Sequence, residues 1–82
     1  MRYADAKCVC QESYKPEHVY TFTGLCVVTG KTVSVTVKAK ELYAYRQGGL
    51  IQDAMPSLTA DDREFLMTGI SAEGWDKTFP DE

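Results

Sequence analysis

The stretch LIQDAMPSLTADDREFLMTG, residues 50–69, carries the densest set of local structure signals in the chain. Thr59 has the side chain of a helix N-cap, and Asp61 and Asp62 follow where the positive end of the helix dipole favours carboxylates. Gly69 can adopt the left-handed conformation that commonly ends a helix. These signals predict a helix over residues 60–68. Its buried side is supplied by Leu58, Phe65, Leu66 and Ile70.

Further helices are predicted on both sides of this stretch. Residues 39–47, AKELYAYRQ, are strong helix formers, and Gly48-Gly49 should end that helix. Residues 50–54 are expected to form one more turn, which stops before Pro56. Ser71 can cap a final short helix through Trp75. Residues 79–82 are expected to be a frayed acidic tail.

The clearest β signal lies in residues 18–38, which are rich in β-branched and aromatic side chains. Thr29-Gly30-Lys31 is typical of a hairpin loop. A three-residue loop makes Val28 face Thr32 and Leu25 face Val35. The apolar face of the hairpin then consists of Leu25, Val27, Val33, Val35 and Val37. Phe22 would point the other way, so a bulge is expected at Gly24.

The N-terminal segment predicts a weakly specified first strand. In residues 2–11 the side chains of Ala4, Ala6, Cys8 and Cys10 would share one strand face. The sequence leaves open whether this strand pairs within the chain or with a second copy, so a homodimer stays an alternative. The predicted fold class is α+β. A two- or three-stranded antiparallel sheet, with its hairpin at about 19–37, would pack against two to three short C-terminal helices in one domain, residues 1–82.

Charge is divided unevenly along the chain. Residues 1–50 hold seven Lys and Arg against four Asp and Glu, and residues 51–82 hold two against eight, for a net charge of -3. The acidic half argues against direct nucleic-acid binding, which needs clustered Lys and Arg. It could instead meet a basic partner or mimic a nucleic acid, although a solvated helix face is the plainer interpretation.

The sequence favours a cytoplasmic protein without a membrane segment. No apolar run approaches the roughly 18–20 residues of a membrane span, and the N-terminus lacks the apolar core of a secretion signal.

Four soft ligands suggest a zinc site as one interpretation. Cys8, Cys10, His18 and Cys26 could in principle form a tetrahedral set, but their spacing departs from the usual zinc knuckle. The alternative is three reduced cysteines that act as small apolar residues, together with a surface histidine.

No catalytic constellation stands out, so neither enzyme activity nor a cofactor is expected. A nucleophilic pair of Cys26 and His18 lacks a third orienting group and a glycine-rich elbow. No phosphate-binding loop or dinucleotide fingerprint is present in the sequence.

The chain has more large side chains than a core of this size needs. Aromatic residues, Met and Arg are enriched in the centres of interfaces, although they could equally fill the core. The contact surface predicted from this excess and from the acidic helix consists of Tyr43, Tyr45, Asp61, Asp62, Glu64 and Trp75.

Residues 49–70, GLIQDAMPSLTADDREFLMTGI, are followed by SAEGWDKTF in residues 71–79. This pattern resembles a group of small bacteriophage-encoded proteins of unassigned function, in which a hairpin like residues 26–31, CVVTGK, precedes a similar helical tail. The resemblance covers roughly residues 25–79 and implies an infected bacterial cytoplasm. It suggests a protein that modulates or inhibits a host protein by surface occlusion, with transcription machinery or a defence nuclease as candidate targets. The alternatives are a small zinc-stabilised module and an acidic nucleic-acid mimic.

Overall fold

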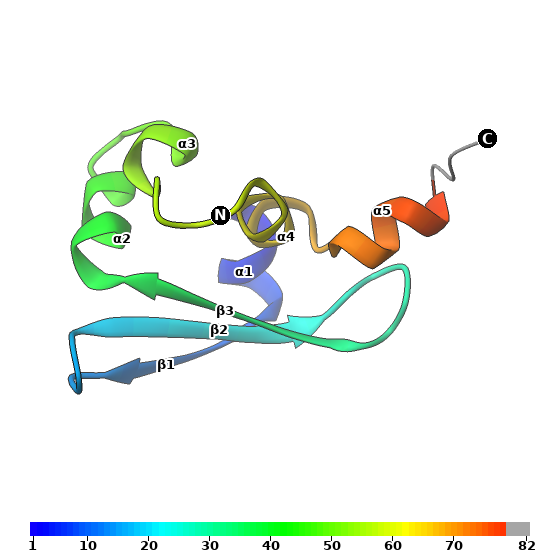
Figure 1. Cartoon of the computed structure of the whole chain (residues 1–82), viewed down its shortest axis with the longest axis horizontal. Coiled ribbons are helices and arrows are strands. Elements are labelled where there is room, and N and C mark those ends of the chain that lie inside the picture. Colours follow the sequence, from blue (N-terminus) through cyan, green and yellow to red (C-terminus); the bar gives the residue numbers. More distant parts are fainter. Residues whose placement is uncertain (79–82) are drawn as a thin grey trace.

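The computed structural model describes residues 1–78, so the predicted tail at residues 79–82 lies outside it. Three strands form one antiparallel sheet in the order β1-β2-β3. The helices lie on one side of this sheet (Figure 1). The α+β fold class is therefore confirmed. In chain order the elements are α1 (Arg2–Lys7), β1 (Val9–Ser13), β2 (Val19–Leu25), β3 (Thr32–Lys38), α2 (Ala39–Arg46), α3 (Ile51–Ala54), α4 (Ala60–Thr68) and α5 (Ala72–Thr78).

Helix α4 forms where its local signals predict it. The hydroxyl of Thr59 accepts a hydrogen bond from the backbone N–H of Asp62 at 3.1 Å, which satisfies one of the free donors at the helix start. Gly69 ends the helix in the left-handed region, with φ of 81°. Phe65 and Leu66 are fully buried, as the pattern predicts.

The other predicted helices are also present. Gly48, with φ of 108°, follows α2, and α3 ends before Pro56. The hydroxyl of Ser71 accepts a hydrogen bond from the N–H of Gly74 at 3.1 Å and so caps α5. This last helix continues to Thr78, beyond the predicted end at Trp75.

The register of the hairpin differs from the predicted one. Leu25 pairs with Thr32 and Phe22 pairs with Val35, so the loop spans residues 26–31 instead of three residues. Pairing continues without interruption through Gly24, which faces Val33, and the predicted bulge is absent from this strand pair.

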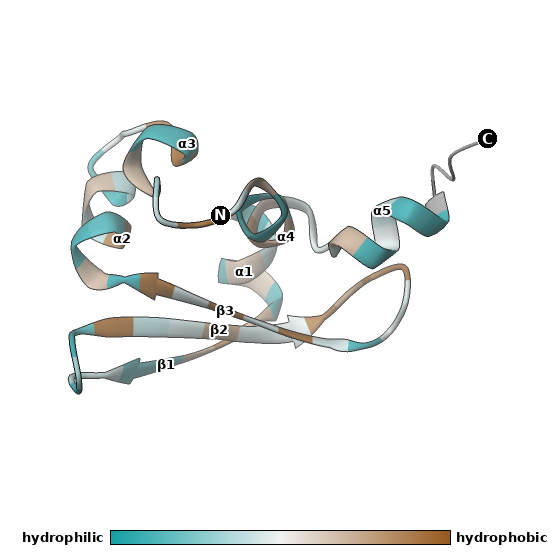
Figure 2. Cartoon of the chain, in the orientation of Figure 1, coloured by the Kyte–Doolittle hydropathy of each residue, from teal (hydrophilic) through white to brown (hydrophobic). Residues whose placement is uncertain are grey.

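This shift changes the β2 side of the apolar face and leaves the predicted β3 side in place. Val35 and Val37 are almost completely buried, as predicted, and Phe22, which was predicted to point the other way, is buried with them. Leu25 and Val27, which were predicted on that face, are 54% and 60% exposed. Figure 2 shows the apolar colour of the β2–β3 loop, which lies beyond the end of the paired strands.

The loop backbone explains why the strands stop early. The N–H of Cys26 donates to the carbonyl of Lys31, and the N–H of Gly30 donates to the carbonyl of Cys26. The N–H of Val27 bonds to the carbonyl of Gly69, at the end of α4. Two of these bonds close the loop on itself, and the bond from Val27 to a distant segment replaces a cross-strand bond that a longer hairpin would have made.

The predicted first strand is wrong over most of its length. Residues 2–7 form α1 because Met1 and Ala4 bury their side chains in the core beside α4. The strand begins only at Val9, and β1 pairs antiparallel with β2 inside the same chain. Cys10 therefore faces Phe22 across the strand pair.

The two faces of the sheet have different chemistry. The covered face contributes Phe22, Val35 and Val37 to a core that the helices complete with Leu42, Met55, Leu58, Phe65 and Leu66. On the opposite face Thr21 bonds to Thr36 at 3.1 Å and Thr23 bonds to Ser34 at 3.0 Å. No helix within residues 1–78 lies over this polar face (Figure 1).

Candidate functional site

The candidate site lies at the end of the sheet where β1 turns into β2 and β3 runs into α2, at the left of Figure 1. Five side chains meet there, and together we call them the tyrosine–histidine cluster: Glu12, Tyr14, His18, Tyr20 and Tyr43. They come from the end of β1, the turn that follows it, the start of β2, and α2.

Strand register and one backbone bond bring the cluster together. Glu12 lies directly opposite Tyr20 in the β1–β2 pair, so their side chains share a face. The carbonyl of His18 accepts a hydrogen bond from the N–H of Ala39 at 3.0 Å, which ties the start of α2 to the start of β2. Tyr43 follows one helical turn after Ala39 and reaches the same place.

The carboxylate of Glu12 is the hub of the cluster. Its Oε2 atom accepts hydrogen bonds from the hydroxyls of Tyr14 at 2.9 Å and Tyr20 at 3.0 Å. Nε2 of His18 lies 2.5 Å from the same oxygen. These contacts, the one with His18 foremost, hold the pKa of Glu12 below its ordinary value because they favour the charged form.

The rings themselves are packed against one another. Tyr14 stacks on His18 with centroids 4.4 Å apart, and Tyr43 meets His18 edge-on at 6.3 Å. The hydroxyls of Tyr20 and Tyr43 lie 3.0 Å apart, and this hydrogen bond is the main reason why the pKa of Tyr20 is raised. Tyr14 is nevertheless 66% exposed and Tyr43 46% exposed. The cluster is thus an ordered aromatic surface that faces solvent.

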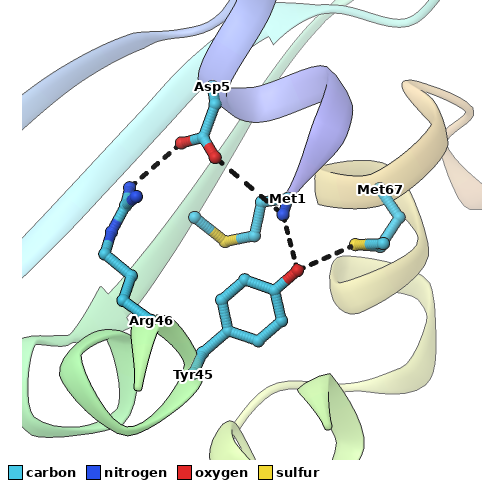
Figure 3. Close-up of polar contacts among 5 residues, drawn as sticks. All are labelled: Met1, Asp5, Tyr45, Arg46 and Met67. Carbon is cyan, nitrogen blue, oxygen red and sulfur yellow. Dashed lines mark hydrogen bonds and ion pairs between the residues drawn. The ribbon is translucent and has the colours of Figure 1, made fainter. Parts of the chain in front are cut away.

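The predicted contact residue Tyr45 lies elsewhere and points inward (Figure 3). Its hydroxyl accepts a hydrogen bond from the α-amino group of Met1 at 2.7 Å and donates to the sulfur of Met67 at 3.9 Å. Asp5 lies 3.9 Å from the same amino group and bonds to Arg46 at 3.0 Å. Burial lowers the pKa of the Met1 amino group. Tyr45 therefore joins α1, α2 and α4.

The remaining predicted contact residues are spread over two helices. Asp61 is exposed at the start of α4, and Asp62 and Glu64 are partly buried there. Trp75 is half-buried on α5. The structure thus brings Tyr43 together with Tyr20 and His18, but it does not gather the six predicted residues into one patch.

Sequence reasoning missed Glu12, Tyr14 and Tyr20 as members of the site. Glu12 and Tyr14 lie close before Pro16, whose peptide bond with Lys15 is cis, and Tyr20 lies after it. The available signal was the spacing of aromatic residues in YKPEHVY, residues 14–20, around that turn. A proline turn between two strands returns the chain on itself and places side chains on either side of it close together.

The four candidate zinc ligands lie in separate places. Cys8 follows α1, Cys10 is exposed on β1, Cys26 is buried after β2, and His18 bonds to Glu12. Among residues 1–78, no group of three His, Cys, Asp or Glu side chains is arranged to hold a metal ion. The tetrahedral set required by the zinc interpretation does not form from these four residues.

Cys26 has an unusual environment of its own. Burial raises the pKa of its thiol, but hydrogen bonds from Ser71 and Thr29 more than compensate and lower the value to about 6. The N–H of Ser71 donates to Sγ at 3.3 Å. Cys26 is only 1% exposed, so the sulfur is an internal acceptor that ties the hairpin loop to the start of α5.

Comparison with known proteins adds no relative. No protein-family model, no curated protein and no solved structure matches this chain. In the part of the chain that the structure describes, no helix is long and apolar enough to cross a membrane.

Proposed function

We propose that this chain is a small binding protein that acts by occupying the surface of another protein, and that the tyrosine–histidine cluster is the centre of its contact surface. The observation that carries this proposal is the combination of exposure and order in one place. Tyr14 is largely exposed and Tyr43 is about half-exposed, yet stacking and hydrogen bonds around Glu12 fix their positions.

Tyrosine surfaces of this kind suit protein recognition for physical reasons. A tyrosine ring buries a large area with few rotatable bonds, so little conformational entropy is lost when it is covered. Rings that are already held in place before binding lose still less conformational entropy when they are covered. In the free protein the polar hydroxyls can form hydrogen bonds with water, so the rings can remain exposed until the partner binds.

The partner we propose is a host protein in the cytoplasm of an infected bacterium. This part of the proposal rests on the resemblance of residues 25–79 to small bacteriophage-encoded proteins. Binding would modulate or inhibit the host protein by surface occlusion. Transcription machinery and a defence nuclease are the candidate targets.

The experiment is affinity capture from bacterial lysate with two bait proteins, the wild type and a Tyr14→Ala/Tyr43→Ala double variant. We expect a host protein that the wild type retains and the double variant loses. Circular dichroism of both baits checks that the fold persists, since the two rings are exposed. If both baits retain the same host proteins, the tyrosine–histidine cluster does not take part in binding.

A second candidate is acidic mimicry of a nucleic acid. Asp61 and Asp62 lie at the start of α4, and neither makes an ion pair within residues 1–78. An Asp61→Asn/Asp62→Asn variant should then lose the captured protein and show a flatter salt dependence. This variant is also the matched control for the tyrosine variant, because each candidate predicts loss in only one of the two.

A further inference from the structure

A shallow hollow of about 340 Å³ adjoins the tyrosine–histidine cluster. It lies between the β1–β2 turn and the first turn of α2, and it is lined by Glu17, His18, Lys38, Ala39, Lys40 and Tyr43. His18 and Tyr43 belong to both the cluster and the hollow. A partner that covers the rings would therefore also cover this hollow.

Two positively charged side chains at the hollow form no ion pair within the described residues. Lys31 pairs with Glu73 at 2.9 Å and Arg46 pairs with Asp5 at 3.0 Å, but Lys38 and Lys40 form no ion pair in residues 1–78. A negatively charged group of a partner could therefore pair with these two ammonium groups without breaking an existing ion pair.

The nearby carboxylates are mostly committed to other contacts. Glu12 is bonded to His18, Tyr14 and Tyr20. Glu41, in the first turn of α2, is only 8% exposed, and its Oε1 accepts a bond from the hydroxyl of Ser57 at 2.8 Å.

Glu17 is the one carboxylate that lines the hollow, and Lys15 in the same turn has the opposite charge. Among the residues that line the hollow, Lys38 and Lys40 outnumber Glu17, so the lining carries a net charge of +1 in a chain whose net charge is -3.

We propose that this hollow receives a carboxylate side chain from an acidic segment of the partner protein, while Tyr14 and Tyr43 pack against the neighbouring apolar atoms. The inference rests on the proposed function and names the chemistry of the partner surface. Charge complementarity favours an anion here. A protein carboxylate fits better than a nucleic-acid backbone, because two lysines displace too few counterions to hold a run of phosphates.

The test is a titration of isotope-labelled protein, followed by NMR chemical shifts, with a blocked hexaglutamate peptide. Blocked hexaglutamine is the neutral control, and inorganic phosphate and a short oligothymidylate are the competing anions. We expect shifts at His18, Lys38, Lys40 and Tyr43 with hexaglutamate, no response to hexaglutamine, and weakening by added salt. If these residues respond only to phosphate or only to the oligonucleotide, the hollow does not bind a protein carboxylate and the proposal is wrong.

Variants then separate the hollow from general charge effects. Lys38→Gln/Lys40→Gln should weaken hexaglutamate binding by roughly tenfold, because the two charges act together. Lys77→Gln on α5, at the far end of the molecule (Figure 1), should weaken it much less. Equal effects of the lysine variants, or shifts spread over the whole surface, would overturn the inference.

The same variants distinguish this inference from the function on which it rests. If the lysine variant still binds the captured partner while Tyr14→Ala/Tyr43→Ala does not, the hollow is excluded and the binding function stands. If neither variant changes partner binding, both proposals fail.

Discussion

Nε2 of His18 lies 2.5 Å from Oε2 of Glu12, at the point where two tyrosine hydroxyls bond to the same carboxylate. This contact joins the end of β1 to the last residue of the turn before β2. It also fixes the ring on which Tyr14 stacks. The order of the exposed aromatic surface therefore depends on one ionisable group.

The Glu12 contacts predict a specific pH dependence. The folded pKa of Glu12 is lowered, so these contacts stabilise the fold fully above the unfolded value of about 4.3, and this contribution is lost as the pH falls through the folded value. NMR titration of the Glu12 carboxyl should show a low pKa that rises in His18→Gln. Glu73, whose pKa is lowered by Lys31, is the internal control and should not change. If the pKa of Glu12 is the same in the wild type and in His18→Gln, the proposed role of Glu12 as the hub of the cluster is wrong.

Replacing Tyr45 by Phe should destabilise the fold although the ring stays in place. The change removes the acceptor of the Met1 amino group and its contact with Met67. We expect a loss of about 1–2 kcal/mol in the free energy of unfolding, measured in urea. Tyr43→Phe removes a hydroxyl at an exposed ring and should cost about 0.5 kcal/mol or less. If the two variants lose equal stability, the contacts of the Tyr45 hydroxyl in Figure 3 do not contribute to the free energy of unfolding.

Gly69→Ala should be more costly than an ordinary glycine substitution at positive φ. A Cβ at Gly69 would lie 2.6 Å from the ring of Tyr3, whereas one at Gly30 would meet nothing within 4 Å. Both residues have similar φ values, 81° and 72°, so Gly30→Ala measures the backbone strain alone, about 1–2 kcal/mol. We expect Gly69→Ala to exceed it by about 1 kcal/mol or more. Urea denaturation would refute the close contact if the two variants lost equal stability.

The thiol of Cys26 should titrate near pH 6 in a Cys8→Ser/Cys10→Ser variant, as followed by the ultraviolet absorbance of the thiolate. Because the folded pKa is below the unfolded value of about 8.5, the contacts of the thiolate stabilise the fold above that value and are lost as the pH falls through 6. Ser71→Ala should move the midpoint upward. A midpoint at or above about 8.5 in the parent variant would show that burial outweighs the hydrogen bonds.

Local chemistry explains which parts of the fold could be predicted from the sequence. The cap at Thr59, the left-handed Gly69 and the stop before Pro56 each depend on a few neighbouring residues, and all three are present. The hairpin register depends on long-range contacts instead. The apolar run Val27-Val28 suggested that the strands continue, but the N–H of Val27 bonds to Gly69 after α4. The sequence pattern of the hairpin gives no sign of this bond, because Gly69 is far from Val27 in the chain.

The same distinction applies to α1 and to the candidate site. Residues 2–7 alternate like a strand, yet Met1 and Ala4 find an apolar surface beside α4 and the segment becomes helical. Tyr43 was predicted as a contact residue from its type alone. Its neighbours Glu12, Tyr14 and Tyr20 could not be identified without the β1–β2 register, because a shift of one residue moves each side chain to the other face.

The most direct test of the binding surface is calorimetric titration of the captured partner with the wild type, Tyr14→Ala/Tyr43→Ala and Asp61→Asn/Asp62→Asn. If the tyrosine–histidine cluster is the centre of contact, the tyrosine variant should bind at least about thirtyfold more weakly, while the aspartate variant keeps the wild-type affinity. Wild-type affinity in the tyrosine variant, with binding lost in the aspartate variant, would contradict this and place the contact on α4.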